Sequence, residues 1–299
     1  ISYGTHLALA ALKQMDDRLD RVVLASVEGL EQTVKLPALT DAYFDRMQAA
    51  LDSDPRAHAA YPDIKAMIAR VHRKLEQHPV LLHLKDPNGK NTDILLQRRS
   101  LQMIAAGPIA DPDGSAMMLA VYRAADAGDY QPLMQLMQRF FAPGEPLKMQ
   151  AMPLVMDVAS GISDKLLAVV NTQAKTALLG DTLNFPMPQL RDAFPELDLG
   201  DGFRKAPVSH VPTLLLSGTL DGRTYPESQL EAVAGLDQLQ AIIVVNAGHN
   251  LFMTSKEVTA AIERFMRGEP MQSARIIVPL PDFTPALPAP PQAAAASKP

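Results

Sequence analysis

The order of hydrophobic and polar positions predicts an α/β core at both ends of the chain. Residues 5–15 are apolar, rich in alanine and free of helix breakers, so they predict a buried helix. The β-branched run at 21–26 is typical of a buried parallel strand. From residue 211 the same pattern returns, with two strands and two helices expected in alternation over 212–218, 227–236, 240–245 and 254–267. Strands that alternate with helices form parallel sheets with crossover connections, so we expect an α/β fold.

The middle of the chain has mostly helical periodicity instead. Apolar side chains recur at helical spacing over 43–51 and 64–75. An Asp-Pro-Asn-Gly turn at 86–89 lies between two apolar runs and predicts a β-hairpin. Further helices are expected over 115–126, over 131–141 and from an N-cap at Ser163 to Gly180, followed by an irregular return loop over 184–207.

These patterns divide the chain into four parts. Residues 1–27 and 208–280 form the core, residues 28–207 form the mostly helical insertion, and residues 281–299 form a Pro/Ala-rich tail that we expect to be flexible. An insertion between two strands of a parallel sheet lies over the edge at which the strands end. Because α/β proteins bind ligands at that edge, we expect the insertion to be a lid.

Composition excludes several classes of function. The chain has 299 residues, a net charge of -5 and 20% charged residues of mixed sign, which gives no basic patch for nucleic acid. It has no cysteine, so disulfides, thiolate metal sites and a cysteine nucleophile are excluded. No apolar run reaches the roughly 18 residues that a membrane span needs. The histidines at 72, 78 and 83 lack metal-ligand spacing, so we expect no metal. The oligomeric state and the compartment stay open.

The first residues of the chain contain part of a catalytic motif. The chain begins at Ile1, without a methionine, and continues Ser-Tyr-Gly into the first predicted helix. This matches the second half of G-x-S-x-G, the tight strand-to-helix turn that presents a nucleophilic serine. We therefore interpret the chain as the C-terminal part of a longer protein, and expect this fragment alone to be inactive because a second oxyanion donor would lie upstream.

Two later loops supply partners for Ser2. Asp221 follows the strand predicted over 212–218, and His249 lies in a glycine-flanked loop after the strand over 240–245. Each residue alone could be an ordinary turn residue, but both loops lie at the edge where the motif presents its serine. The chain order Ser, Asp, His is also the order of one known triad arrangement. We therefore predict that Ser2 attacks a carbonyl, His249 takes its proton and Asp221 orients the imidazole.

The same residues carry a resemblance to a family. Ser-Tyr-Gly-Thr followed by His-Leu-Ala-Leu-Ala at 2–10, Leu-Ser-Gly-Thr-Leu-Asp-Gly-Arg-Thr at 216–224 and Ala-Gly-His at 247–249 resemble the tripeptidyl/prolyl aminopeptidase branch of the α/β-hydrolases. The resemblance covers residues 1–35 and 205–268. It implies the C-terminal part of an α/β-hydrolase fold with a helical cap, the triad named above and no cofactor. It also implies that the backbone N–H of Tyr3 forms one half of the oxyanion hole.

The expected substrate is a small peptide or ester. An aminopeptidase must bind a substrate ammonium, and the candidate carboxylates are Glu28, just past the first predicted strand, and Asp157, in an apolar run. An ordinary loop acid at Glu28 and a helix-start or paired acid at Asp157 are the competing interpretations. Three functions therefore stay open: a serine exopeptidase acting on the N-terminus of short peptides, a carboxylesterase or amidase, and a non-catalytic or truncated relative of such enzymes.

Overall fold

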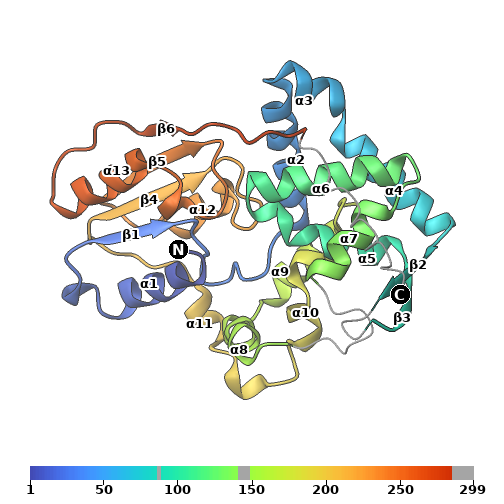
Figure 1. Cartoon of the computed structure of the whole chain (residues 1–299). Coiled ribbons are helices and arrows are strands. Elements are labelled where there is room, and N and C mark those ends of the chain that lie inside the picture. The colour runs from blue at the N-terminus through green and yellow to red at the C-terminus, as the bar shows by residue number, and fades with distance from the viewer. Residues whose placement is uncertain (86–88, 141–148, 285–299) are drawn as a thin grey trace, which may run out of the picture.

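The chain forms two regions that lie side by side in the computed structural model (Figure 1), which describes residues 1–85, 89–140 and 149–284. We call residues 1–36 and 205–284 the sheet region and residues 37–204 the helical region. The sheet region occupies the left of the view, and the helical region occupies the right and the bottom.

Four parallel strands form the sheet, in the order β1-β4-β5-β6. Their bounds are β1 Val22–Ala25, β4 Thr213–Gly218, β5 Leu239–Val245 and β6 Arg275–Ile277. Every residue of β4 is buried, as its continuous apolar run predicts for a central parallel strand. The expected α/β class is therefore confirmed. Only the three-residue edge strand β6 was not predicted from the sequence.

Helices cover both faces of the sheet. They are α1 Tyr3–Gln14, α12 Pro226–Ala232 and α13 Lys256–Met266. On one face, Leu9 of α1 and Ala232 of α12 pack with Leu215 of β4. On the other face, Phe265 of α13 packs with Leu214 of the same strand. Because neighbouring residues of a strand point to opposite faces, the Leu-Leu pair in β4 serves both cores.

The helical region contains one hairpin and most of the helices. Its longer elements are α2 Pro37–Asp52, α3 Pro55–Ala60, α4 Ile64–Gln77, β2 Val80–Lys85, β3 Asn91–Leu96, α5 Arg98–Ala106, α6 Pro112–Asp126, α7 Gln131–Phe140, α8 Ala151–Ser160 and α9 Asp164–Gln173. Short helices follow at α10 Met187–Leu190 and α11 Gly200–Arg204, and 3-10 turns occur at η2 Pro108–Ala110, η3 Thr182–Asn184 and η4 Pro195–Leu197. The sheet region has two further 3-10 turns among its described residues, η1 Asp16–Arg18 and η5 Leu251–Met253.

One apolar core joins the two regions. The buried helices α2, α4 and α6 form most of it, through side chains such as Phe44, Ile68 and Leu119. Leu220 and Tyr225 of the sheet region belong to the same cluster. The loop that carries Asp221 is therefore packed directly against the helical region.

Two predictions for the second half of the helical region differ clearly from the structure. The Ser163 side chain caps α9 as expected, by accepting a hydrogen bond from the Leu166 N–H, but α9 ends at Gln173, well before Gly180. The expected loop over 184–207 contains α10, η4 and α11, and the first two have proline in their first turn, where the missing N–H costs nothing.

The hairpin strands are confirmed in antiparallel register, with Val80 opposite Leu96. Residues 86–88 of its turn and residues 285–299 of the predicted tail lie outside the described residues. Within the described part of the chain, no helix is both long and apolar enough to cross a membrane.

Candidate active site

Ser2 occupies a strained turn at the carboxyl end of β1. It is the N-cap of α1 and has φ 53° and ψ −133°, a conformation that favours glycine. Its N–H donates to the Ala25 carbonyl at 3.3 Å, and it forms a parallel bridge with Val27. Non-glycine residues keep such backbone angles only where the surroundings enforce them, and they occur preferentially at functional sites.

Asp221 and His249 form a hydrogen-bonded pair. The His249 Nδ1 atom lies 3.1 and 3.2 Å from the two carboxylate oxygens of Asp221. Asp221 has no exposed surface. Burial alone would raise the pKa of Asp221, but the bonds from His249 and Thr224 outweigh burial and lower it. An ionised carboxylate can only accept, so the Nδ1 atom of His249 carries the hydrogen and the Nε2 atom is left to act as a base.

Backbone and hydroxyl donors hold the Asp221 carboxylate in place. The N–H groups of Arg223 and Thr224 donate to Oδ1 at 2.8 Å, and the Thr224 hydroxyl donates to Oδ2 at 2.6 Å. The residues just after Asp221 therefore fold back around its side chain. Sequence reasoning missed this role of Thr224, although an Asp followed three residues later by Thr is a signal of such a turn.

The structure brings Ser2 and His249 to the same edge of the sheet. The buried Ser26 side chain donates to the His249 carbonyl at 2.7 Å, and the neighbouring Ala25 carbonyl accepts the Ser2 N–H. Among the described residues, no hydrogen bond joins the Ser2 hydroxyl to the His249 ring. Catalytic hydrogen bonds are often long without substrate and tighten when substrate binds, so this arrangement is compatible with a nucleophile and its base.

Two glycines let the helical region pack against the loops that carry Asp221 and His249. A Cβ atom on Gly222 would lie 2.1 Å from the Ile109 carbonyl oxygen, and one on Gly248 would lie 2.5 Å from an oxygen of Asp111. The Ala110 carbonyl accepts the His249 N–H at 2.9 Å. Asp111 accepts the Asn250 N–H at 3.1 Å, so this side chain of the helical region binds the histidine loop.

A cavity of about 370 Å³ opens beside Ser2, in the size range of small-molecule sites. Ser2 and Tyr3 line it together with both predicted acids, Glu28 and Asp157. Tyr3 is the first residue of α1, a position whose N–H has no acceptor within the helix. The predicted nucleophile, oxyanion donor and ammonium-binding acids therefore face one space.

The two acids in this cavity have different surroundings. Glu28 is mostly buried and forms an ion pair with Lys35 at 2.7 Å. Asp157 lies in the last turns of α8, not at a helix start, and no hydrogen bond to its carboxylate is found among the described residues. Burial and then the charge of Glu28 raise the pKa of Asp157 to about 6. Asp157 therefore lacks a partner, whereas Glu28 has one.

The two buried histidines, His6 and His72, have structural surroundings. His6 is buried, stacks on Tyr3, and its ring nitrogens lie 3.2 Å from the Gly29 carbonyl and the Ser160 hydroxyl. His72 is buried against the Tyr122 hydroxyl at 2.8 Å, and burial lowers its pKa to about 4. In the described residues, no group of three or more His, Asp or Glu side chains could hold a metal ion.

Comparison with known proteins adds no assignment. No protein-family model matches the chain, and no curated protein matches it in sequence.

Proposed function

We propose that this chain is the catalytic part of a serine hydrolase with the α/β-hydrolase fold, in which the helical region is the lid. The observation that carries the proposal is the buried Asp221–His249 pair at the sheet edge where Ser2 adopts a strained turn. A serine, a histidine and a buried carboxylate in this order form a nucleophile, its base and the group that orients the base.

The proposed reaction proceeds through an acyl-enzyme. The Ser2 hydroxyl attacks the substrate carbonyl while the Nε2 atom of His249 takes its proton. The Tyr3 N–H stabilises the oxyanion, and Asp221 stabilises the imidazolium that forms. His249 then gives the proton to the leaving amine or alcohol. A water molecule, activated by the same imidazole, releases the acyl group from Ser2.

The charges of the cavity favour an exopeptidase over an esterase for apolar substrates. A substrate ammonium needs a carboxylate, and Asp157 and Glu28 both line the cavity with Ser2. Lys35 already forms an ion pair with Glu28, so Asp157 is the acid whose carboxylate is available to pair with an ammonium. We propose that Asp157 binds the free N-terminus of a short peptide. The ion pair of Glu28 and Lys35 would hold the neighbouring wall of the cavity in place.

Paired substrates test this proposal. An aminoacyl-arylamide, its N-acetylated form and a p-nitrophenyl ester of a simple acid are compared on the full-length wild-type protein, with Ser2→Ala in the same protein as the blank. We expect N-acetylation to lower kcat/KM at least about tenfold, because one charge-assisted contact is worth about 1.5–3 kcal/mol. An unchanged rate after N-acetylation would contradict the exopeptidase, and faster turnover of the simple ester would favour the esterase.

A further inference from the structure

We infer that Arg223 binds a carboxylate of the substrate, so that the substrate is a short peptide carrying both a free ammonium and a free carboxylate. The inference rests on the proposed function, because it names the substrate class of the same cavity. It starts from the position of Arg223, two residues after the proposed triad aspartate.

The backbone of Arg223 is fixed by the catalytic loop. Its N–H donates to Asp221 Oδ1 at 2.8 Å, and the next residue, Thr224, donates twice to the same carboxylate. The Arg223 side chain is partly buried and lines the cavity that contains Ser2. A guanidinium is therefore anchored close to the proposed chemistry.

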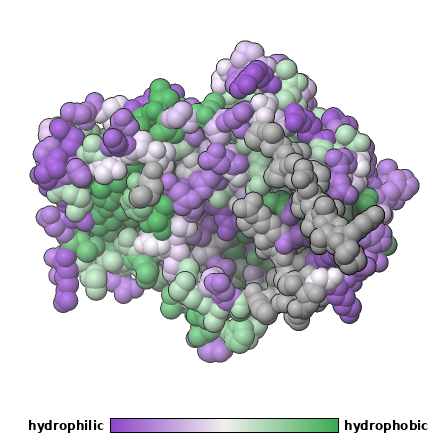
Figure 2. All heavy atoms as spheres, in the orientation of Figure 1, coloured by the Kyte–Doolittle hydropathy of each residue, from purple (hydrophilic) through white to green (hydrophobic). Residues whose placement is uncertain are grey.

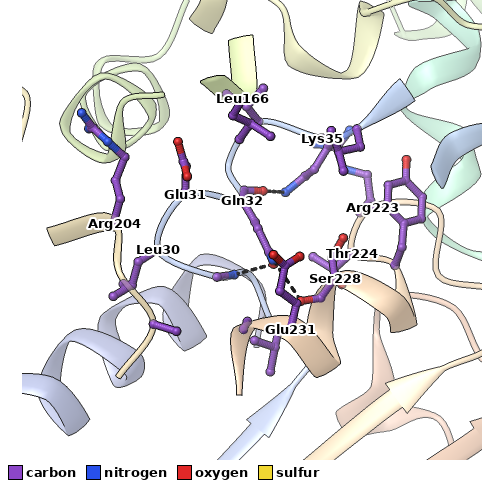
Figure 3. Close-up of a pocket in the computed structure, with 17 residues that line it drawn as sticks. Leu30, Glu31, Gln32, Lys35, Leu166, Arg204, Arg223, Thr224, Ser228 and Glu231 are labelled. Atoms are coloured by element: carbon purple, nitrogen blue, oxygen red, sulfur yellow. Dashed lines mark hydrogen bonds between the residues drawn. The ribbon is translucent and has the colours of Figure 1, made fainter. Parts of the chain in front are cut away.

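Arg223 also lines a second cavity, of about 190 Å³ (Figure 3). Arg204 lies at one end of this cavity, and Lys35 and Arg223 lie at the other. The second cavity shares Lys35, Arg223 and Thr224 with the cavity of Ser2, so these residues form a common wall. If the carboxylate of a bound peptide lies at Arg223, the second cavity can accommodate the peptide residue that bears this carboxylate.

The other two cations that line these cavities are already paired. Lys35 binds Glu28 at 2.7 Å and also donates to the Gln32 carbonyl. Arg204 donates to the Ser160 carbonyl at 2.9 Å and forms ion pairs with Asp198 and Asp201. In the described part of the chain, no hydrogen bond or ion pair involves the Arg223 guanidinium. Arg223 is thus the cation that is left to bind a ligand.

Asp157 and Arg223 together give the cavity of Ser2 two unpaired charges of opposite sign. They do not form an ion pair with each other, although the charge of Arg223 acts to lower the pKa of Asp157. A guanidinium presents parallel N–H groups that match the two oxygens of a carboxylate. A ligand with an ammonium and a carboxylate would satisfy both groups, and a cavity of about 370 Å³ limits it to a short peptide.

Peptide binding to Ser2→Ala, measured by calorimetry, tests the inference without turnover. The first pair of ligands is trialanine with a free C-terminus and trialanine amide. The second pair is Ala-Glu-Ala amide and Ala-Gln-Ala amide, which separates a side-chain carboxylate from a terminal one. Each pair is measured in the Ser2→Ala background alone, with Arg223→Gln added, and with Arg18→Gln added as a control at an exposed arginine.

We expect the carboxylate member of one pair to bind about tenfold or more tightly, and Arg223→Gln to abolish that preference while leaving the affinity for the amide unchanged. Arg18→Gln should keep the preference. The pair that shows the effect identifies the carboxylate as terminal or side-chain. Equal affinities in both pairs, a preference that survives Arg223→Gln, or no binding of any peptide would overturn the inference. Labelling of Ser2 by a fluorophosphonate, measured on the wild type, tests the proposed function separately.

Discussion

Asp221 of the sheet region and Asp157 of the helical region have opposite surroundings. In the sheet region, Asp221 accepts hydrogen bonds from two backbone N–H groups, one hydroxyl and one imidazole. In the helical region, Asp157 is also largely buried but has no such donors in the described residues, and its pKa is raised to about 6. A carboxylate with donors keeps its charge and its position, whereas one without donors remains available to a ligand. Under the proposed function, the difference distinguishes Asp221, which would orient the histidine, from Asp157, which would bind the substrate.

Both regions expose some large apolar side chains, such as Leu7 of α1 and Met152 of α8. Figure 2 shows hydrophobic side chains exposed over the left part of the molecule, where Figure 1 places β1. β1 is the edge strand of the parallel sheet, and Val22 and Val23 at its start are only partly buried. In the helical region, the large apolar side chains of α2, α4 and α6 are buried in the shared core.

The largest expected effect comes from replacing the Asp221 carboxylate by a neutral amide. Asp221→Asn should lower kcat by about 10⁴, because the imidazole loses the acceptor that fixes its tautomer. Hydrolysis of an aminoacyl-arylamide measures the loss. Asp237→Asn is the matched control, since Asp237 also pairs with a histidine, His210, but at an exposed site. Comparable losses in both variants would contradict the special role of Asp221.

The next largest expected effect is a loss of stability, and it tests whether the two regions unfold together. Phe44 has no exposed surface and belongs to the core that includes Leu220 and Tyr225 of the sheet region. Phe44→Ala should lower the free energy of unfolding by about 3–5 kcal/mol. A single transition is expected in calorimetry, whereas Leu81→Ala, at a half-exposed strand position, should change stability by no more than about 0.5 kcal/mol. Two separate transitions in Phe44→Ala would show that the shared core does not couple the regions.

The sequence predicts the sheet region better than the helical region for a physical reason. The strands β4 and β5 are continuous apolar runs, and their period and length leave little choice of structure. The turn after Gln173 and the short helices α10 and α11 depend on contacts with distant residues, such as the bond from Lys13 to the Gly202 carbonyl. The local sequence preference for helix or turn does not predict contacts between residues that are far apart in the chain.

A smaller effect is expected from the contact between the helical region and the histidine loop. Asp111→Ala removes the acceptor of the Asn250 N–H, so the loop that carries His249 should lose part of its alignment. We expect kcat to fall about 10- to 100-fold with little change in KM, since small misplacements of a catalytic group have effects of that size. Asp113→Ala, at an exposed position of the same helix, should leave kcat unchanged. Equal effects of the two substitutions would contradict the positioning role of Asp111.

The smallest expected effect concerns the unpaired carboxylate. The pKa of Asp157 is raised in the folded protein, so the folded state retains a proton that the unfolded state loses between about pH 4 and pH 6. Stability contributed by this group is therefore lost as pH rises through that window. Asp157→Asn should make the protein more stable at pH 7 by roughly 1 kcal/mol, because solvent screening at this partly exposed side chain reduces the 1.36 kcal/mol expected per pKa unit.

The same substitution should weaken binding of a substrate ammonium about tenfold at pH 7. In the wild type that affinity should rise with pH through about 6, as Asp157 loses its proton, and Asp157→Asn should remove the rise. Chemical denaturation and peptide binding at pH 5 and pH 7 measure both effects, with the exposed Asp164→Asn of the same region as the control. A more stable variant that still binds the ammonium normally would remove Asp157 from the proposed site.

The candidate site shows the same limit of sequence reasoning. Ser2, Asp221 and His249 can be predicted from the sequence because strand ends and glycine-flanked loops mark one edge of a sheet. Lys35, Asp111 and Arg223 were not found, because their roles depend on which charges already have partners. The ion pair of Lys35 with Glu28 and the unpaired guanidinium of Arg223 appear only when the cavity is seen in three dimensions.

The most direct test of the central claim is the identity of the nucleophile. The wild-type protein, Ser2→Ala and His249→Ala are treated with a fluorophosphonate, digested and analysed by mass spectrometry. We expect the label on Ser2 of the wild type, no label in Ser2→Ala and much slower labelling of Ser2 in His249→Ala. Label on a different serine, or labelling that is equal in the wild type and Ser2→Ala, would contradict the assignment of Ser2, His249 and Asp221 as a catalytic triad.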